Sequence, residues 1–228
     1  MTLHGPARWR VLLTVPALIV AAALTALLVF GAPGGRGAAL ADAHATHDPG
    51  RDIALQQDMR ALWEEHITWT RMVIVDFAAG LPSLNASEVR LLRNQTDIGN
   101  AIARFYGRAA GNRLTSLLRQ HILIAVDVLT AAKAGDQAGL ARAQARWARN
   151  GNQIADFLSS ANPTAWRRAE MRQMMRGHLK LTTDEAVARL TGNVSADVRA
   201  FDKVHTQALG MADMLSAGIV SQFPRRFP

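Results

Sequence analysis

Four histidines in the body of the chain fall on apolar stripes of amphipathic helical patterns. They are His66, His121, His178 and His205, each with hydrophobic residues at helical spacings on both sides. A stripe covers only about a third to a half of a helix circumference, so four placements out of four are not expected by chance. Imidazole is a common ligand of late transition metals and also a proton shuttle. The pattern therefore predicts inward-facing histidines that bind a metal ion or another small ligand.

One carboxylate can join these histidines. Glu185 stands seven residues after His178, on the same helix face two turns further on. Helical bundles build metal sites from such inward groups, but di-iron bundles use Glu-x-x-His pairs. Here the residues three positions before the histidines are Trp63, Leu118, Met175 and Asp202. A ferritin-type centre is disfavoured, and the candidate ligands are the four histidines with Glu185.

A purely structural role for the histidines is the alternative. Thr70 and Thr182 stand four residues after two of them, and Asn94, Asn150 and Gln207 lie on the following helices. A fully paired polar layer of this kind fixes helix register without any ligand. The arrangement of the hairpins decides between a ligand site and a structural polar layer. If the hairpins stack in an open row, equivalent histidines are about 16–20 Å apart, too far to share one ion. If the hairpins close around an axis, three or four histidines can come together.

Methionines form a second group with possible chemistry. Met171, Met174 and Met175 precede His178, and Met211 and Met214 follow on the next helix. Thioether and imidazole ligands suit Cu(I). Methionine is also an ordinary filler of helical cores, and we expect packing to explain these residues.

Helical apolar spacing runs through the chain from residue 52 onward and predicts an all-α fold. Positions recur: His66, His121 and His178 are 55 and 57 residues apart, and the motifs at Ile98, Ile154 and Met211 are 56 and 57 apart. We expect a bundle of about six helices built from three tandem helical hairpins. The predicted helices span residues 52–79, 85–107, 111–134, 137–161, 165–190 and 195–222.

The N-terminus resembles a targeting segment. Arg8 and Arg10 precede an uncharged run from Val11 to Phe30, and Ala-x-Ala triplets follow at residues 39–45. These are the parts of a secretory signal. The run is also long enough, at about 30 Å, to remain as a transmembrane anchor. We expect a signal peptide or anchor helix at 1–31, a Gly/Ala/Pro-rich linker at 32–51 and a helical domain at 52–228. The body is then extracytoplasmic, membrane-anchored or secreted.

Composition narrows the partners. The chain carries a formal charge of +8 and no cysteine, which excludes disulfides, thiolate metal sites and cysteine nucleophiles. Part of the excess is a run of arginines at Arg142, Arg146, Arg149, Arg167, Arg168, Arg172 and Arg176. Such a surface could attract an anionic envelope surface, but we favour the simpler explanation that these arginines lie on solvated faces of amphipathic helices. Aromatic residues do not interleave with it, so nucleic acid is not expected as a partner.

Two segments resemble a known family. Residues 92–99 (LRNQTDIG) and the closing stretch from Phe201 through Met211 to Pro224 are similar to an uncharacterised family of exported bacterial all-helical proteins. The resemblance implies the fold and the export. Members sometimes carry the label glycosyltransferase, but this chain has no βαβ pattern, no glycine-rich phosphate loop and no Gly-x-Ser-x-Gly elbow. It implies no enzyme activity and no site residues.

The sequence thus predicts a non-enzymatic, extracytoplasmic helical bundle that binds a metal ion or small ligand through inward histidines. The alternative is a structural or interaction module of the cell envelope with no ligand. The metal, any protein partner and the oligomeric state are left open.

Overall fold

The computed structural model describes residues 49–227, which form an all-α bundle. Within that range six α-helices follow one another: α1 (Pro49–Ala79), α2 (Leu84–Tyr106), α3 (Arg108–Ala134), α4 (Gln137–Ala161), α5 (Arg168–Leu190) and α6 (Val194–Gln222). A short 3₁₀ turn, η1 (Pro224–Arg226), comes after them. The predicted targeting segment and most of the linker lie outside the described residues.

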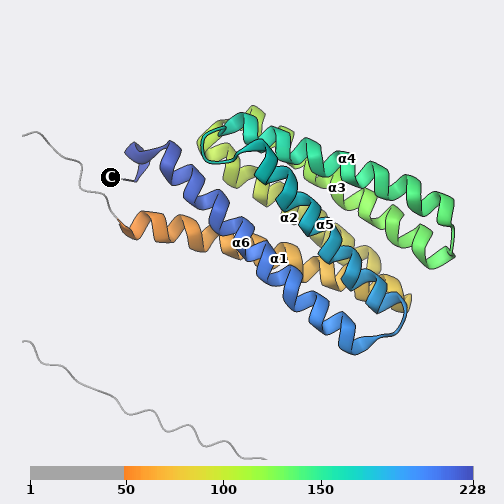
Figure 1. Ribbon diagram of the computed structural model, residues 1–228. Helices are drawn as coiled ribbons and strands as arrows, with labels where there is room; N and C mark the ends of the chain where they lie inside the picture. Colours follow the sequence, from red (N-terminus) through yellow and green to blue (C-terminus); the bar gives the residue numbers. More distant parts are fainter. Residues whose placement is uncertain (1–48, 228) are drawn as a thin grey trace, which may run out of the picture. The chain divides into compact units, whose positions relative to one another are not determined.

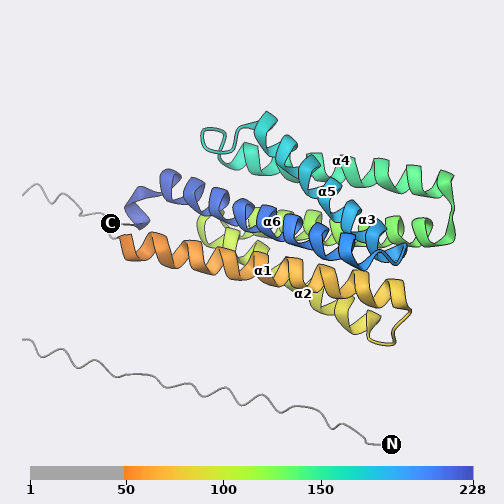
Figure 2. The same ribbon diagram turned by 60° about the horizontal axis from the view of Figure 1, so that its bottom comes forward.

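The helices pack as antiparallel neighbours in a closed order (Figures 1 and 2). Each helix contacts the next one along the chain, and α6 returns to pack against α1. Helix α1 also contacts α3 and α5, so the three helices that begin the hairpins face one another across the interior. The closed alternative considered from the sequence is therefore the one that the structure adopts.

Turn chemistry sets the helix ends. Gly135 has a φ of 69° in the left-handed region and ends α3, a conformation that glycine adopts without strain. Asp136 then caps α4 by accepting a hydrogen bond from the Gly139 amide, and Asn193 caps α6 in the same way.

Three helices begin three residues away from their predicted starts, and the first of them, α1, begins earlier, at Pro49. Helix α3 begins at Arg108, because the chain turns at Gly107 alone, with a φ of 85°. Helix α5 begins later than predicted, at Arg168. The intervening turn is held by Asn162, whose Oδ1 accepts from the Ala165 amide, and by Trp166, which is fully buried.

One helix among the described residues, α3, is long and apolar enough to span a membrane by length and composition. It packs between α2 and α4, and Leu114, Leu117 and Val128 are buried in the bundle. Its apolar character is that of a core helix.

Close packing between α2 and α3 depends on two glycines. A Cβ atom on Gly111 would lie 2.6 Å from the Gly99 carbonyl oxygen and 2.6 Å from the Ala103 Cβ. Because neither neighbour is the end of a flexible side chain, we expect Gly111→Ala to destabilise the protein by about 1–3 kcal/mol. The control is Gly210→Ala on α6, where nothing lies within 4 Å of the added atom. It should instead stabilise by about 0.5–1 kcal/mol, and urea unfolding of both variants measures the difference.

Candidate ligand site in the bundle interior

Three of the four histidines meet inside the bundle. His66 of α1, His121 of α3 and His178 of α5 are buried. The ring centroids of His66 and His178 are 6.0 Å apart, and those of His121 and His178 are 6.2 Å apart. They meet because the closed order of hairpins turns α1, α3 and α5 toward a common interior.

Each ring is held by an amide side chain of the partner helix. In every hairpin the histidine Nδ1 contacts an amide 29 residues further along the chain. The pairs are His66 with Gln95 (3.1 Å), His121 with Asn150 (2.8 Å) and His178 with Gln207 (3.1 Å). The equal spacing supports the period read from the sequence.

The amides also bond the main chain of the histidine's own helix. Asn150 donates to the Leu117 carbonyl and Gln207 to the Met174 carbonyl, each four residues before the histidine. In the first hairpin Asn94 makes this bond, to Leu62. Gln95, which the sequence did not single out, contacts the Nδ1 of the ring. In the first hairpin, two adjacent residues thus make the two contacts that a single amide makes in the other hairpins: Asn94 bonds the main chain and Gln95 contacts the ring.

These partners fix which ring nitrogen carries the proton in two of the histidines. The Nδ1 atoms of His121 and His178 face amide oxygens, Asn150 Oδ1 and Gln207 Oε1, so each Nδ1 donates. Each Nε2 is then left with a lone pair. At His66 the facing atom is Gln95 Nε2, a donor, and Nδ1 accepts.

Gln95 leaves a further acceptor in the interior. Its side chain is fully buried, and its Oε1 has no hydrogen-bond partner within the described range. A buried acceptor without a partner costs about 1–3 kcal/mol. Together with the Nε2 lone pairs of His121 and His178, it makes an interior rich in acceptors. A species that supplies donors or positive charge would satisfy them.

The three imidazoles do not supply that charge themselves. Burial, together with repulsion from His178 and His121, lowers the pKa of His66 to about 3, with the neighbouring amide of Asn94 opposing the shift. Burial and repulsion from His178 lower the pKa of His121 to about 3 against the Asn150 bond. Burial lowers the pKa of His178 as well. All three rings are neutral near pH 7, which is the form that binds metal ions.

A small cavity lies between the rings. Its volume is about 50 Å³, and the three histidines and Gln95 are its polar lining. One water needs about 10–15 Å³ by this measure, so the cavity is large enough for a bare ion or a few waters. Apolar side chains complete the wall, among them Met175 and Met211.

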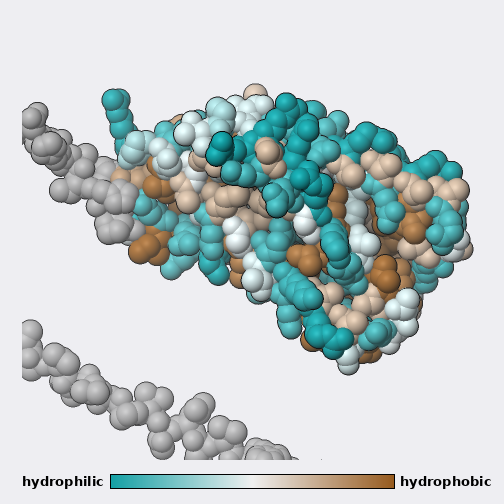
Figure 3. All heavy atoms as spheres, viewed as in Figure 1, coloured by the Kyte–Doolittle hydropathy of each residue, from teal (hydrophilic) through white to brown (hydrophobic). Residues whose placement is uncertain are grey.

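A second, more apolar cleft begins one turn further along the helices. It has a volume of about 80 Å³ and starts at Thr70 and Thr182, each four residues after a histidine. Its other lining residues are almost all aliphatic and come from α1 to α5. Figure 3 shows apolar side chains around a hollow at this end of the bundle.

His205 lies apart from the other three histidines. Its Nε2 is 2.8 Å from the Glu64 carboxylate of α1 in a partly exposed pair. Its ring packs on Phe201, at 5.7 Å between centroids.

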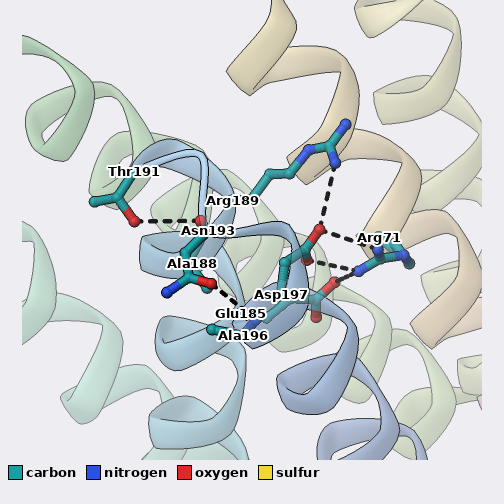
Figure 4. A network of polar contacts seen from close by, with 8 residues as sticks. All are labelled: Arg71, Glu185, Ala188, Arg189, Thr191, Asn193, Ala196 and Asp197. Carbon is teal, nitrogen blue, oxygen red and sulfur yellow. Dashed lines mark hydrogen bonds and ion pairs between the residues drawn. The ribbon is translucent and has the colours of Figure 1, made fainter.

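Glu185 belongs to a buried ion-pair network rather than to the histidine cavity (Figure 4). Arg71 of α1 reaches Glu185 Oε1 at 2.8 Å and Asp197 Oδ1 at 2.9 Å, and Arg189 contacts Asp197 at 3.3 Å. Burial raises the pKa of Glu185 to about 7, with Arg71 opposing the shift and Asp197 adding to it. The structure therefore brings together three of the five predicted ligands.

Several arginines of the run between Arg142 and Arg176 form ion pairs within the bundle. Arg168 and Arg172 both bond the Asp156 carboxylate, and Arg146 bonds Asp127. Binding to an anionic envelope surface stays a prediction.

Comparisons of the chain with family models, curated proteins and solved structures found no match. Function is therefore inferred from the side chains and cavities of residues 49–227. Over that range, no group of three or more His, Cys, Asp or Glu side chains stands in a ready-made metal arrangement. Rings bound tetrahedrally to one ion would have centroids about 5 Å apart. The pairs His66–His178 and His121–His178 are slightly wider, at 6.0 and 6.2 Å.

Proposed function

We propose that this protein binds a metal ion in the interior of the bundle, through the Nε2 atoms of His66, His121 and His178. The observation that carries the proposal is the convergence of three neutral imidazoles on one cavity, each with its Nδ1 held by an amide. Metal-bound histidines are usually held in this way, with the second ring nitrogen engaged by a neighbouring polar group.

Binding requires one local change. For His66 to offer an Nε2 lone pair, its Nδ1 must carry the proton, and the Gln95 amide must turn so that Oε1 faces the ring. That turn gives Oε1 the partner it lacks, at the expense of the Gln95 bonds to Leu91 and Asn94.

The site of action we propose is extracytoplasmic. The support is the sequence Arg8–Phe30, with its basic start and apolar run. The body then meets metal ions outside the cytoplasm, and the absence of cysteine in the chain leaves histidine and methionine as its soft ligands.

The test is metal retention by the full-length chain. Protein purified in detergent is equilibrated with Zn(II), Co(II), Cu(II) or Cu(I), desalted and analysed for bound metal. We expect one ion per chain from at least one of these metals, and a melting temperature that falls with chelator. At 100 times Kd the ion should add about 2.7 kcal/mol to the free energy of unfolding.

His121→Gln is the matched loss variant, and His205→Gln the control. The first removes a ligand from the cavity, and we expect it to abolish retention and the chelator response. The second makes the same change outside the cavity and should leave both intact. If the wild-type chain retains none of the metals and ignores chelator, the three histidines form a structural polar layer and the proposal is wrong.

A further inference from the structure

The cavity contains no group that can neutralise a bound ion. Its polar lining is His66, His121, His178 and Gln95, all uncharged. Glu185, the carboxylate that the sequence predicted as a ligand, is held by Arg71 in the separate network. A metal ion in the cavity therefore keeps its full charge in a poorly polarisable interior. Because the desolvation penalty grows with the square of the charge, a divalent ion suffers it about four times as strongly as a monovalent ion of equal size.

Two thioethers line the same cavity. Met175 of α5 lies one turn before His178, and Met211 of α6 lies one turn after Gln207. The other two hairpins carry side chains without sulfur at these positions: Trp63 and Leu118 correspond to Met175, and Ile98 and Ile154 to Met211. All four also line the cavity. Within the described residues, only the third hairpin contributes sulfur atoms to the cavity wall. It does so at both of the equivalent positions, Met175 and Met211.

We propose that the cavity selects soft monovalent ions, Cu(I) above all, and that Met175 and Met211 supply sulfur ligands beside the histidines. The inference rests on the proposed function and names the ion that the same site takes. Neutral imidazole and thioether donors suit Cu(I), whereas Zn(II) is usually held with thiolate or carboxylate ligands as well.

The apolar wall adds to this selection. Cu(II) prefers tetragonal geometry with nitrogen and oxygen donors. The rest of the lining is aliphatic or aromatic, for example Ile102, Leu158 and Leu215, and offers no such donors. A Cu(I) ion with few, soft ligands fits without them.

The experiment compares ions on the full-length protein. Ag(I) serves as a redox-inert analogue, Cu(I) is titrated anaerobically against a competing chromophoric chelator, and Zn(II) is measured in parallel. We expect Cu(I) and Ag(I) to bind at one per chain with a Kd at least about 100-fold below that of Zn(II). X-ray absorption of the Cu(I) protein should show sulfur as well as nitrogen neighbours.

Met175→Leu and Met211→Ile test the sulfur ligands, because leucine stands at the first position in the second hairpin (Leu118) and isoleucine at the second position in both other hairpins (Ile98 and Ile154). Such volume-conserving changes preserve folding. Each should weaken Cu(I) binding by at least about tenfold, remove sulfur from the absorption spectrum and leave Zn(II) binding unchanged. Met171→Leu is the control: this methionine is fully buried on α5 but does not line the cavity.

The outcomes separate the two proposals. Retention of no ion at all overturns the proposed function, and the present inference with it. Zn(II) binding as tight as that of Ag(I), or Cu(I) binding unchanged in both methionine variants, overturns only the soft-ion inference and leaves a histidine site for harder ions.

Discussion

The stability lost on His121→Gln is expected to be about 2 kcal/mol smaller at pH 5 than at pH 8. Burial and the neighbouring His178 lower the pKa of His121 from 6.5 to about 3 in the folded protein. Between these values the unfolded chain binds a proton that the folded chain excludes. Acid therefore removes stability from the wild type as the pH falls below 6.5. The glutamine variant, which has no imidazole here, escapes that loss.

The pH dependence has to be taken from the difference between the wild type and His121→Gln, because another buried group, Glu185, changes the stability of both proteins with pH in the opposite direction. Burial raises the pKa of Glu185 from 4.5 to about 7. The folded chain binds the extra proton in that window, so this group adds stability as the pH falls from 7 and loses it as the pH rises. Both proteins carry Glu185, and its contribution cancels in their difference.

Denaturant unfolding at each pH gives the required free energies. His205→Gln is the control, since it removes a partly exposed pair with Glu64 that is worth less than about 1 kcal/mol. A difference between wild type and His121→Gln that stays constant from pH 8 to pH 5 would contradict the burial of a neutral ring at this position. Metal-free protein is used, because a bound ion also competes with protons for the imidazole.

Much of the fold could be predicted from periodicity. The helical spacing and the stops at Gly80, Gly135 and Gly192 place most helix ends correctly, because glycines with positive φ do end these helices. The recurrence of His66, His121 and His178 indicated equivalent positions, and the three histidine–amide bonds of equal spacing agree with it. The packing of α6 against α1, which closes the bundle, could not be predicted from the sequence. It depends on which faces of the first and last helix are complementary in shape.

The site was predicted in part, for reasons that lie in single residues. His205 has the spacing of an inward residue, but its ring is partly exposed and pairs with Glu64 of α1 instead of entering the cavity. Gln95 was missed because it is one position from Asn94, which is about 100° of rotation, and only packing decides which amide reaches the ring. Arg71 and Asp197 gave no sequence signal, because charged residues are common on helices and their pairing joins positions 126 residues apart.

The last prediction concerns this pairing. Arg71→Met is expected to lower the free energy of unfolding by about 3–5 kcal/mol, because it leaves two buried carboxylates without their shared partner. Arg71 bonds Glu185 at 2.8 Å and Asp197 at 2.9 Å, and both carboxylates are almost completely buried. Methionine keeps an apolar stem beside Phe201, over which the guanidinium lies at 4.6 Å. Removal of the charge, rather than lost packing, then dominates the effect.

The control variant is Arg60→Met on the same helix. Arg60 bonds Asp213 at 2.8 Å, but both side chains are more than a third exposed, and water screens the pair. Its loss should change stability by less than about 1 kcal/mol. Equal effects of the two substitutions would show that the Arg71 network is hydrated and does not hold α1 to α5 and α6.

A triple variant distinguishes the stability that the ion pairs themselves contribute from the penalty of leaving buried carboxylates unpaired. Arg71→Met with Glu185→Leu and Asp197→Leu removes all three central charges, and such apolar replacements are often neutral or stabilising by about 1–4 kcal/mol. We expect it to recover most of the stability lost in Arg71→Met, and Arg189, which contacts Asp197 at 3.3 Å, is free to turn toward solvent. If the triple variant instead stays as unstable as Arg71→Met, the network contributes through specific geometry, and the closure of α6 on α1 depends on the hydrogen bonds of Arg71 themselves.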